Sequence, residues 1–147
     1  MGQQQLLLVI LVTIIVGIST VVAINTFGSA AEGAMRDAVR LDLLGAAGTA
    51  QSYFIRPTML GGGGRNYSTI DFSRFHFPGR IVEGSNNLVT LNDNARYIIS
   101  DQTASEFIIT AFIEDGKQTT VAARVCRNTI RLGDFSFGTA PAPPACN

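Results

Sequence analysis

The sequence has few of the residues from which catalytic and metal-binding sites are built. It contains one histidine, His76, so no histidine-based catalytic or metal cluster can form. Its two cysteines, Cys126 and Cys146, form neither a CxxC nor a CxxCH motif, which excludes a structural zinc site built on cysteines alone and an attached c-type haem. The 11 basic and 11 acidic residues balance, so the composition favours neither a nucleic-acid site nor binding to anionic lipid. We therefore expect a protein without a cofactor or a bound metal, and not an enzyme.

Charge is also missing from the whole N-terminal part of the chain, because no charged residue precedes Glu32. Residues 6–24 of this part form an apolar run whose polar interruptions are Thr13, Ser19 and Thr20. As a helix, 19 residues extend about 28 Å, close to the hydrocarbon thickness of a bilayer. Hydroxyl side chains can bond to carbonyls of their own helix. The run therefore predicts a segment that can span a membrane.

Two simpler explanations of the run can be weighed. A cleavable signal peptide usually begins with a basic segment, and residues 1–5 contain no basic residue. A single-pass anchor is usually flanked by lysine or arginine, whereas the first basic residue here is Arg36. The uncharged stretch of residues 25–31 would also extend beyond a bilayer. We therefore expect the run to be covered by lipid or by copies of itself.

The helical pattern continues beyond the apolar run. Apolar residues recur at three- and four-residue steps at Ala34, Met35, Ala38, Leu41 and Leu44, with Val39, Ala46 and Ala47 beside them. This spacing predicts an amphipathic half that packs on the chain's own body, with Gly45 and Gly48 allowing close packing against a sheet. The helix should end at Arg56 and Pro57, since the residue before a proline is pushed out of the helical region. The predicted element is about 50 residues long, with Gly17 as a point where it could unwind on assembly.

The segment after this helix contains four consecutive glycines, Gly61 to Gly64. No Lys-Ser/Thr pair follows them, so we predict a flexible connector and not a phosphate-binding loop. Asn66, Tyr67 and Ser68 form a sequon, which makes Asn66 a candidate glycosylation site. We expect three nearby aromatic residues to fill the space between helix and sheet: Phe72, Phe75 and Phe77.

The C-terminal half has the pattern of strands. Four runs, at residues 87–91, 96–100, 106–114 and 119–125, are separated by short turn signals that include Asp115-Gly116. They predict an antiparallel meander that covers the amphipathic half of the helix. The predicted fold class is α+β: a long N-terminal helix on a four-stranded antiparallel sheet.

The two cysteines define the tail. In an exported protein a disulfide between Cys126 and Cys146 is the default. It would close a loop of about 20 residues and contribute roughly 3 kcal/mol in the chain-entropy model. We expect this disulfide-bounded loop, residues 126–146, to fold Ile130, Leu132, Phe135 and Phe137 back over the sheet.

The half-apolar long helix, the four-stranded antiparallel sheet and the C-terminal disulfide loop together resemble a type IV pilin. The resemblance is architectural and covers essentially the whole chain. It implies that a prepilin peptidase removes a leader, that Met1 becomes the processed and methylated N-terminus, and that residues 1–30 serve as a membrane anchor before assembly and as the filament core afterwards. Residues 31–147 would form the globular head. Two positions differ from the usual family pattern: Gln5 stands where most members have glutamate, and Val22 stands where many have proline.

From the resemblance we expect a structural subunit of an extracellular pilus, serving adhesion, motility or DNA uptake. Its expected partners are identical subunits, the inner membrane before assembly, the prepilin peptidase and the pilus assembly machinery. A pseudopilin of a type II secretion system is the alternative, although pseudopilins typically lack the disulfide; an anchored periplasmic protein is a further one. The residues expected to make the assembly contacts are Gln5, Leu6, Leu7, Leu8, Ile10, Leu11, Ile14, Ile15 and Ile18.

Overall fold

The computed structural model of the chain describes residues 2–114 and 117–146. A single long helix, α1 (Gly2–Ile55), comes first and is followed by a short 3-10 helix, η1 (Thr58–Leu60). The strands are β1 (Arg80–Ile81), β2 (Val89–Leu91), β3 (Arg96–Ser100), β4 (Glu106–Ile113), β5 (Thr119–Cys126), β6 (Ile130–Leu132) and β7 (Ser136–Phe137). The described residues fall into two compact units that divide between Asp37 and Ala38.

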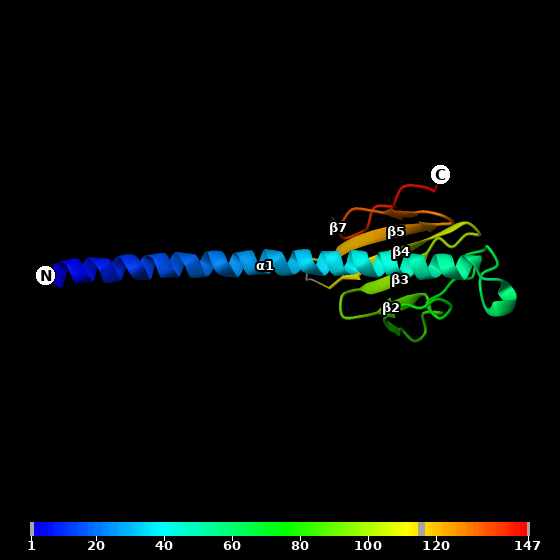
Figure 1. Ribbon diagram of the computed structural model, residues 1–147, viewed down its shortest axis with the longest axis horizontal. Coiled ribbons are helices and arrows are strands. Elements are labelled where there is room, and N and C mark those ends of the chain that lie inside the picture. Colours follow the sequence, from blue (N-terminus) through cyan, green and yellow to red (C-terminus); the bar gives the residue numbers. More distant parts are fainter. Residues whose placement is uncertain (1, 115–116, 147) are drawn as a thin grey trace. The chain divides into compact units, whose positions relative to one another are not determined.

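The second unit, from Ala38 onward, places its part of α1 across one face of an antiparallel sheet (Figure 1). The strand order is β1-β2-β3-β4-β5-β6, and β7 also pairs with β5. The four predicted strands correspond to β2 to β5, so the α+β class and the antiparallel meander are confirmed. The described sheet is larger than predicted, because the short strands β1, β6 and β7 extend its two edges. The Asp115-Gly116 turn signal lies outside the described residues.

The buried face of α1 differs from the predicted one. The large residues Leu41 and Leu44 are 70% and 44% exposed, whereas Val39, Ala46 and Ala47 are buried. Small alanines let the helix backbone come close to the sheet, so the face that carries them becomes the core face. The buried helix residues are Val39, Leu43, Ala46, Ala47, Ala50, Tyr53 and Phe54. Gly45 and Gly48 are also exposed, and no described atom outside their own helix lies within 4 Å of the position a Cβ would take, so the prediction that they pack against the sheet is wrong.

Aromatic residues fill the core between helix and sheet, as predicted. Phe72, Phe75 and Phe77 belong to the same buried cluster as the helix and strand residues. The ring of Phe72 lies 5.2 Å from that of Phe77, which in turn lies edge-on to the ring of Tyr97 at 4.8 Å. A second chain of rings joins the helix residue Phe54 to the buried Tyr67 at 4.5 Å. Such tilted contacts add to the stabilisation from buried apolar area.

The four glycines form a cap on α1 and not the flexible connector predicted. The N–H groups of Gly63, Gly64 and Arg65 donate to the carbonyls of Tyr53, Arg56 and Phe54. Carbonyls in the last turn of a helix have no partner within the helix, so this loop satisfies them. A Cβ added at Gly62 or Gly63 would lie within 2.4 Å of a backbone oxygen. The loop is therefore packed against the helix end, and glycine is needed there for space.

The tail after Cys126 first extends the edge of the sheet. Ile130 and Leu132 belong to β6, which pairs with β5. Together with Phe135 they pack partly buried against the core. Phe137 is 69% exposed, so the prediction that it folds back over the sheet is wrong. An edge strand gains hydrogen bonds to β5, which a cover on top of the sheet would not make.

Candidate functional site

The most unusual surface of the chain is the apolar segment, residues 6–24 of α1. Its large apolar side chains are each about half exposed or more, from 47% at Ile10 to 68% at Leu7. The described residues from Gly2 to Met35 are all exposed. Monomeric soluble proteins rarely expose contiguous apolar surface beyond a few hundred Å². The apolar segment therefore requires a cover.

Two hydroxyl groups within the apolar segment, those of Thr13 and Thr20, bond to carbonyls of their own helix. The hydroxyl of Thr13 donates to the carbonyl of Ile10 at 2.8 Å, and the hydroxyl of Thr20 donates to that of Val16 at 2.8 Å. The helix is continuous through Gly17. Such bonds lower the free-energy cost of placing these two threonines in an apolar environment.

Among the described helices, α1 is long and apolar enough to cross a membrane. The apolar segment is thus compatible with membrane association, which is the coarser part of the predicted localisation. All nine predicted assembly residues are exposed. Among the eight apolar ones, Ile10 is 47% exposed and the others are more than half exposed. Gln5 lies in the first turns of α1 and is exposed. Met1 lies outside the described residues.

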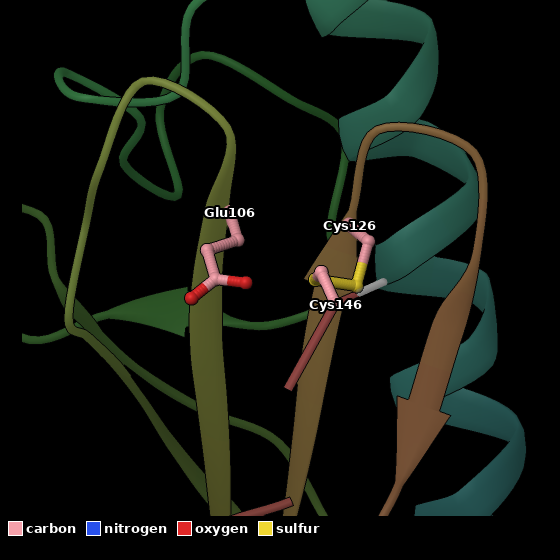
Figure 2. Close-up of side chains that lie close together, drawn as sticks. All are labelled: Glu106, Cys126 and Cys146. Carbon is pink, nitrogen blue, oxygen red and sulfur yellow. A yellow bond between two sulfur atoms is a disulfide. The ribbon is translucent and has the colours of Figure 1, made fainter. Parts of the chain in front are cut away.

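The predicted disulfide between Cys126 and Cys146 is present and closes a separation of 20 residues. Figure 2 shows the carboxyl group of Glu106 beside it, with a carboxylate oxygen and both sulfur atoms within 4.8 Å of one another. Because the sulfur atoms are bonded to each other, they are not thiolates available to a metal ion. Glu106 and the disulfide therefore help to hold the C-terminal loop on the sheet.

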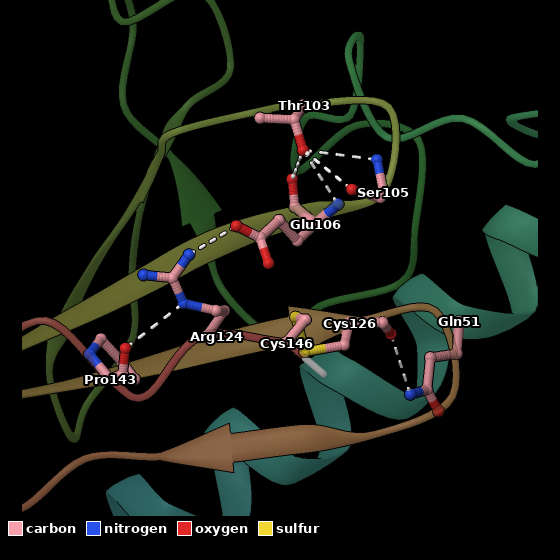
Figure 3. Close-up of a disulfide and its surroundings, with 8 residues drawn as sticks. All are labelled: Gln51, Thr103, Ser105, Glu106, Arg124, Cys126, Pro143 and Cys146. Carbon is pink, nitrogen blue, oxygen red and sulfur yellow. Dashed lines mark hydrogen bonds and ion pairs between the residues drawn. A yellow bond between two sulfur atoms is a disulfide. The ribbon is translucent and has the colours of Figure 1, made fainter.

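The disulfide-bounded loop is held at further points (Figure 3). Nη1 of Arg124 donates to Oε1 of Glu106 at 2.6 Å, and its Nε donates to the carbonyl of Pro143 at 3.3 Å. Nε2 of Gln51 donates to the carbonyl of Cys126 at 3.4 Å, which joins the start of the loop to α1. Arg124 and Glu106 are mostly buried, so solvent screens their interaction less than it would a surface pair. The tail is consequently a fixed surface.

The sequon lies in an ordered turn. Asn66 is exposed, and its Oδ1 accepts a hydrogen bond from the backbone N–H of Ser68 at 2.7 Å. Tyr67, the residue between them, is fully buried, and burial raises the pKa of its hydroxyl to about 12. The acceptor side chain is accessible, while its neighbour is fixed in the core.

Two exposed apolar sites were missed by the sequence reasoning. One is the outward helix face with Leu41 and Leu44, described above. The other is the loop after α1, where Met59 and Leu60 are 95% and 71% exposed. The exposure of Leu41 and Leu44 could have been predicted from the alanines at 46, 47 and 50, because small residues mark the helix face that packs closely. The exposure of Met59 and Leu60 could not be predicted from the sequence, because it depends on the glycine cap.

Comparison of the chain with family models, with curated proteins and with solved structures finds no match.

Proposed function

We propose that the chain is the structural subunit of an extracellular filament of the type IV pilus kind, which polymerises through its apolar segment. The single observation that carries the proposal is the continuous exposure of the large apolar side chains in residues 6–24. Full burial of one such side chain contributes about 1.5–3 kcal/mol. Burial of the whole segment against copies of itself would then contribute on the order of 20 kcal/mol or more relative to water.

Before assembly, the lipid bilayer would cover the apolar segment. Lipid tails and the interior of a helix bundle are similarly apolar, so transfer from one to the other requires little change in hydrophobic free energy. In this proposal the unassembled subunit resides in the inner membrane, and the assembled filament is extracellular. The bundle of identical helices is a heterologous, non-closing arrangement, which propagates into a filament.

The outward helix face favours assembly over a simple anchor. Leu41 and Leu44 lie outside the membrane-length run, yet they are exposed on a helix whose other face is buried against the sheet. Lipid would not reach these residues if the apolar segment spans the bilayer. Neighbouring copies would cover them.

The fixed C-terminal loop favours a pilus over a secretion pseudopilin. The disulfide and the Glu106–Arg124 pair hold residues 126–146 as a stable outer surface. A surface exposed along a long extracellular filament benefits from such cross-links. Adhesion, motility and DNA uptake are the roles such a surface serves.

The test is immunogold electron microscopy of sheared surface material from cells that express the chain. We expect thin filaments labelled by antibody to the head. Ile14→Asp should abolish them because it places a charge in the bundle core, whereas Ile14→Leu should not. Leu41→Asp should insert in the membrane normally and yet give fewer filaments, with the exposed Asp93→Lys as its control. A chain that stays in the membrane fraction and forms no filaments even on overexpression would contradict the proposal.

A further inference from the structure

A small polar pocket lies where the last turns of α1 meet the loop that carries the core phenylalanines. It has a volume of about 220 Å³. Polar side chains from both segments line it, and these include Thr49, Ser52, Arg56, Arg74 and His76. We call this the basic pocket. Its position on the unit formed by residues 38–147 is separate from the apolar segment and from the disulfide-bounded loop.

The charge of the basic pocket is positive. Arg56 and Arg74 line it and are exposed, and no carboxylate is among its described lining residues. Asp71 lies beside it and accepts a hydrogen bond from Nε of Arg74 at 3.3 Å. Hydrogen bonds to the hydroxyl of Tyr53 and to Asp71 raise the pKa of Arg74. Asp71 thus offsets the charge of Arg74, and Arg56 leaves the pocket with a net attraction for an anion.

The end of α1 does not oppose an anion at this place. The last carbonyls of a helix carry partial negative charge, because they have no partner within the helix. The glycine cap donates N–H groups to the carbonyls of Tyr53, Phe54 and Arg56. These bonds offset much of the negative potential that the helix end would otherwise add to the pocket.

The two aliphatic hydroxyl groups of the pocket present acceptors and not donors. The hydroxyl of Thr49 donates to the carbonyl of Ala46 at 2.9 Å, and that of Ser52 donates to the carbonyl of Gly48 at 3.1 Å. A hydroxyl has a single hydrogen, so each oxygen has only lone pairs left for a ligand. A sulfate ion has no hydrogen to donate to them. A ligand with its own hydroxyl groups can donate to both.

The size of the basic pocket favours a small ligand that is one unit of a longer one. Pockets for drug-sized ligands have volumes of about 300–1,000 Å³, and this one is smaller. An adjoining pocket of about 450 Å³ shares three of its lining residues, which are Arg74, Phe75 and His76. A second unit of the same ligand would therefore have room beside the first.

We propose that the basic pocket binds one unit of an acidic saccharide, a sugar that carries a carboxylate beside free hydroxyl groups. Arg56 and Arg74 hold the carboxylate, and the oxygens of Thr49 and Ser52 accept hydrogen bonds from the sugar hydroxyl groups. The inference names a ligand for the adhesive role in the proposed function. It rests on that function only for its setting, because a single head can bind the sugar without a filament.

Calorimetric titration of the full chain in detergent micelles tests the ligand class. The acidic probes are methyl glucuronide and N-acetylneuraminic acid. Methyl glucoside lacks the carboxylate, and inorganic sulfate carries charge without a hydroxyl group. We expect at least one acidic sugar to bind about tenfold or more tightly than both methyl glucoside and sulfate, because only the acidic sugars satisfy the arginines and the hydroxyl oxygens together. Which of the two binds more tightly identifies the kind of acid.

Matched variants locate the binding. Arg56→Gln should weaken the affinity for the acidic sugar about tenfold, whereas Arg65→Gln removes an exposed arginine that follows the glycine cap but does not line the pocket, and should leave it unchanged. Ser52→Ala should weaken it several-fold. Ser29→Ala is its control, since that hydroxyl makes the same kind of bond to a carbonyl of α1 outside the pocket. Thermal unfolding of each variant checks that the head is folded.

The outcomes separate this inference from the filament proposal. Sulfate that binds as tightly as the acidic sugars would show a plain anion site and overturn the inference. Equal losses in Arg56→Gln and Arg65→Gln would show attraction by overall charge and overturn it as well, as would the absence of binding to either acidic sugar. None of these results affects the filament proposal, which electron microscopy tests. A chain that binds the sugar but forms no filaments would overturn the filament proposal alone.

Discussion

The hydroxyl of Tyr97 donates a hydrogen bond to Oδ2 of Asp42 at 2.7 Å, and this bond ties β3 to α1. The same oxygen accepts bonds from the side-chain amides of Asn92 and Asn94, each at 2.8 Å. Tyr97 is fully buried, and this burial raises the pKa of its hydroxyl, with the bond to Asp42 adding to the effect. The Asp42 carboxylate therefore holds the turn between β2 and β3 against the helix.

Replacing Asp42 with alanine should destabilise the head by about 2–3 kcal/mol. A hydrogen bond to a charged group contributes about 1.5–3 kcal/mol, and the buried hydroxyl of Tyr97 would lose its acceptor. The measurement is denaturant unfolding of the full chain in detergent micelles. Asp93→Ala changes an exposed carboxylate in the same turn and should alter stability by less than about 0.5 kcal/mol. Equal effects of the two substitutions would show that the Asp42 contacts contribute nothing.

Tyr67 gives the opposite expectation, because its buried hydroxyl has no hydrogen-bond partner among the described residues. Tyr67→Phe removes this unpaired group and should stabilise the head at neutral pH by about 1 kcal/mol. Tyr97→Phe, which breaks the bond to Asp42, should destabilise it. The paired variants compare the same chemical change with and without a partner, and unfolding midpoints in denaturant measure both.

The raised pKa of Tyr67 predicts that the stability of the head falls at alkaline pH. The pKa of Tyr67 is raised from 10.0 to about 12, so the folded state favours the neutral hydroxyl. Below about pH 10 the hydroxyl is neutral in both the folded and the unfolded chain, so pH has no effect through Tyr67. As the pH rises from about 10 toward 12, the hydroxyl ionises first in the unfolded chain, and the free energy of unfolding falls by up to about 1.4 kcal/mol for each pH unit. Stability of the unmodified chain should therefore fall over this range, and Tyr67→Phe should show a shallower decline. An unchanged slope in the variant would contradict this assignment.

Removal of the disulfide should weaken the tail. The Cys126→Ser, Cys146→Ser double variant should lose about 3 kcal/mol, the value expected for a loop of 20 residues. Reduction of the unmodified chain should give the same loss, while reductant should leave the double variant unchanged. Proteolysis should then cut within residues 127–145 first, since β6 and β7 are short edge strands. A chain whose unfolding midpoint does not respond to reductant would contradict this role.

The glycine cap predicts opposite effects for two glycine-to-alanine substitutions. A Cβ at Gly63 would lie 2.4 Å from the carbonyl oxygen of Asn66 and 2.7 Å from the Tyr53 ring. Gly63→Ala should therefore destabilise the head by more than about 1 kcal/mol. Gly48→Ala, on the open face of α1, should stabilise the helix by about 0.5–1 kcal/mol. Thermal unfolding of both variants checks the sign, and a neutral Gly63→Ala would show that the loop is not packed as described.

The elements of the fold could be predicted from the sequence wherever local patterns decide them. The apolar run, the stop before Pro57 and the alternation in β4 and β5 each follow from the periodicity of neighbouring residues. The rotation of α1 could not be read in the same way. Leu41 and Leu44 are more hydrophobic than Ala46 and Ala47, yet backbone approach to the sheet favours the smaller residues.

Long-range contacts account for the other differences. The glycines at 61–64 have the composition of a linker, and their capping bonds to Tyr53, Phe54 and Arg56 depend on the loop turning back on the helix. The pairing of β6 with β5 likewise depends on a free edge, which the sequence of residues 130–132 does not reveal. The disulfide was predictable because two cysteines permit one pairing within the chain. The exposure of Met59 and Leu60 likewise emerges only from the packed structure.

Gln5 offers the sharpest test of how subunits register in the proposed filament. It is a polar residue next to the apolar segment, and its amide can accept or donate a hydrogen bond but carries no charge. A hydrogen bond between helices in apolar surroundings contributes about 1–2 kcal/mol, and 1.4 kcal/mol corresponds to a tenfold change in an equilibrium. Gln5→Leu should therefore lower the ratio of sheared filament to membrane-bound subunit by about tenfold. Gln5→Glu, which introduces the residue usual in type IV pilins, should retain assembly.

Thr13→Val is the matched control for Gln5→Leu, because it also replaces a polar side chain in the same helix. Its hydroxyl bonds to carbonyls of its own helix and is not needed by a neighbour, so filament yield should stay unchanged. Quantitative immunoblots of the sheared and membrane fractions measure both variants. If Gln5→Leu assembles as well as Thr13→Val, registration does not depend on the amide, and apolar packing alone must set the stagger between subunits.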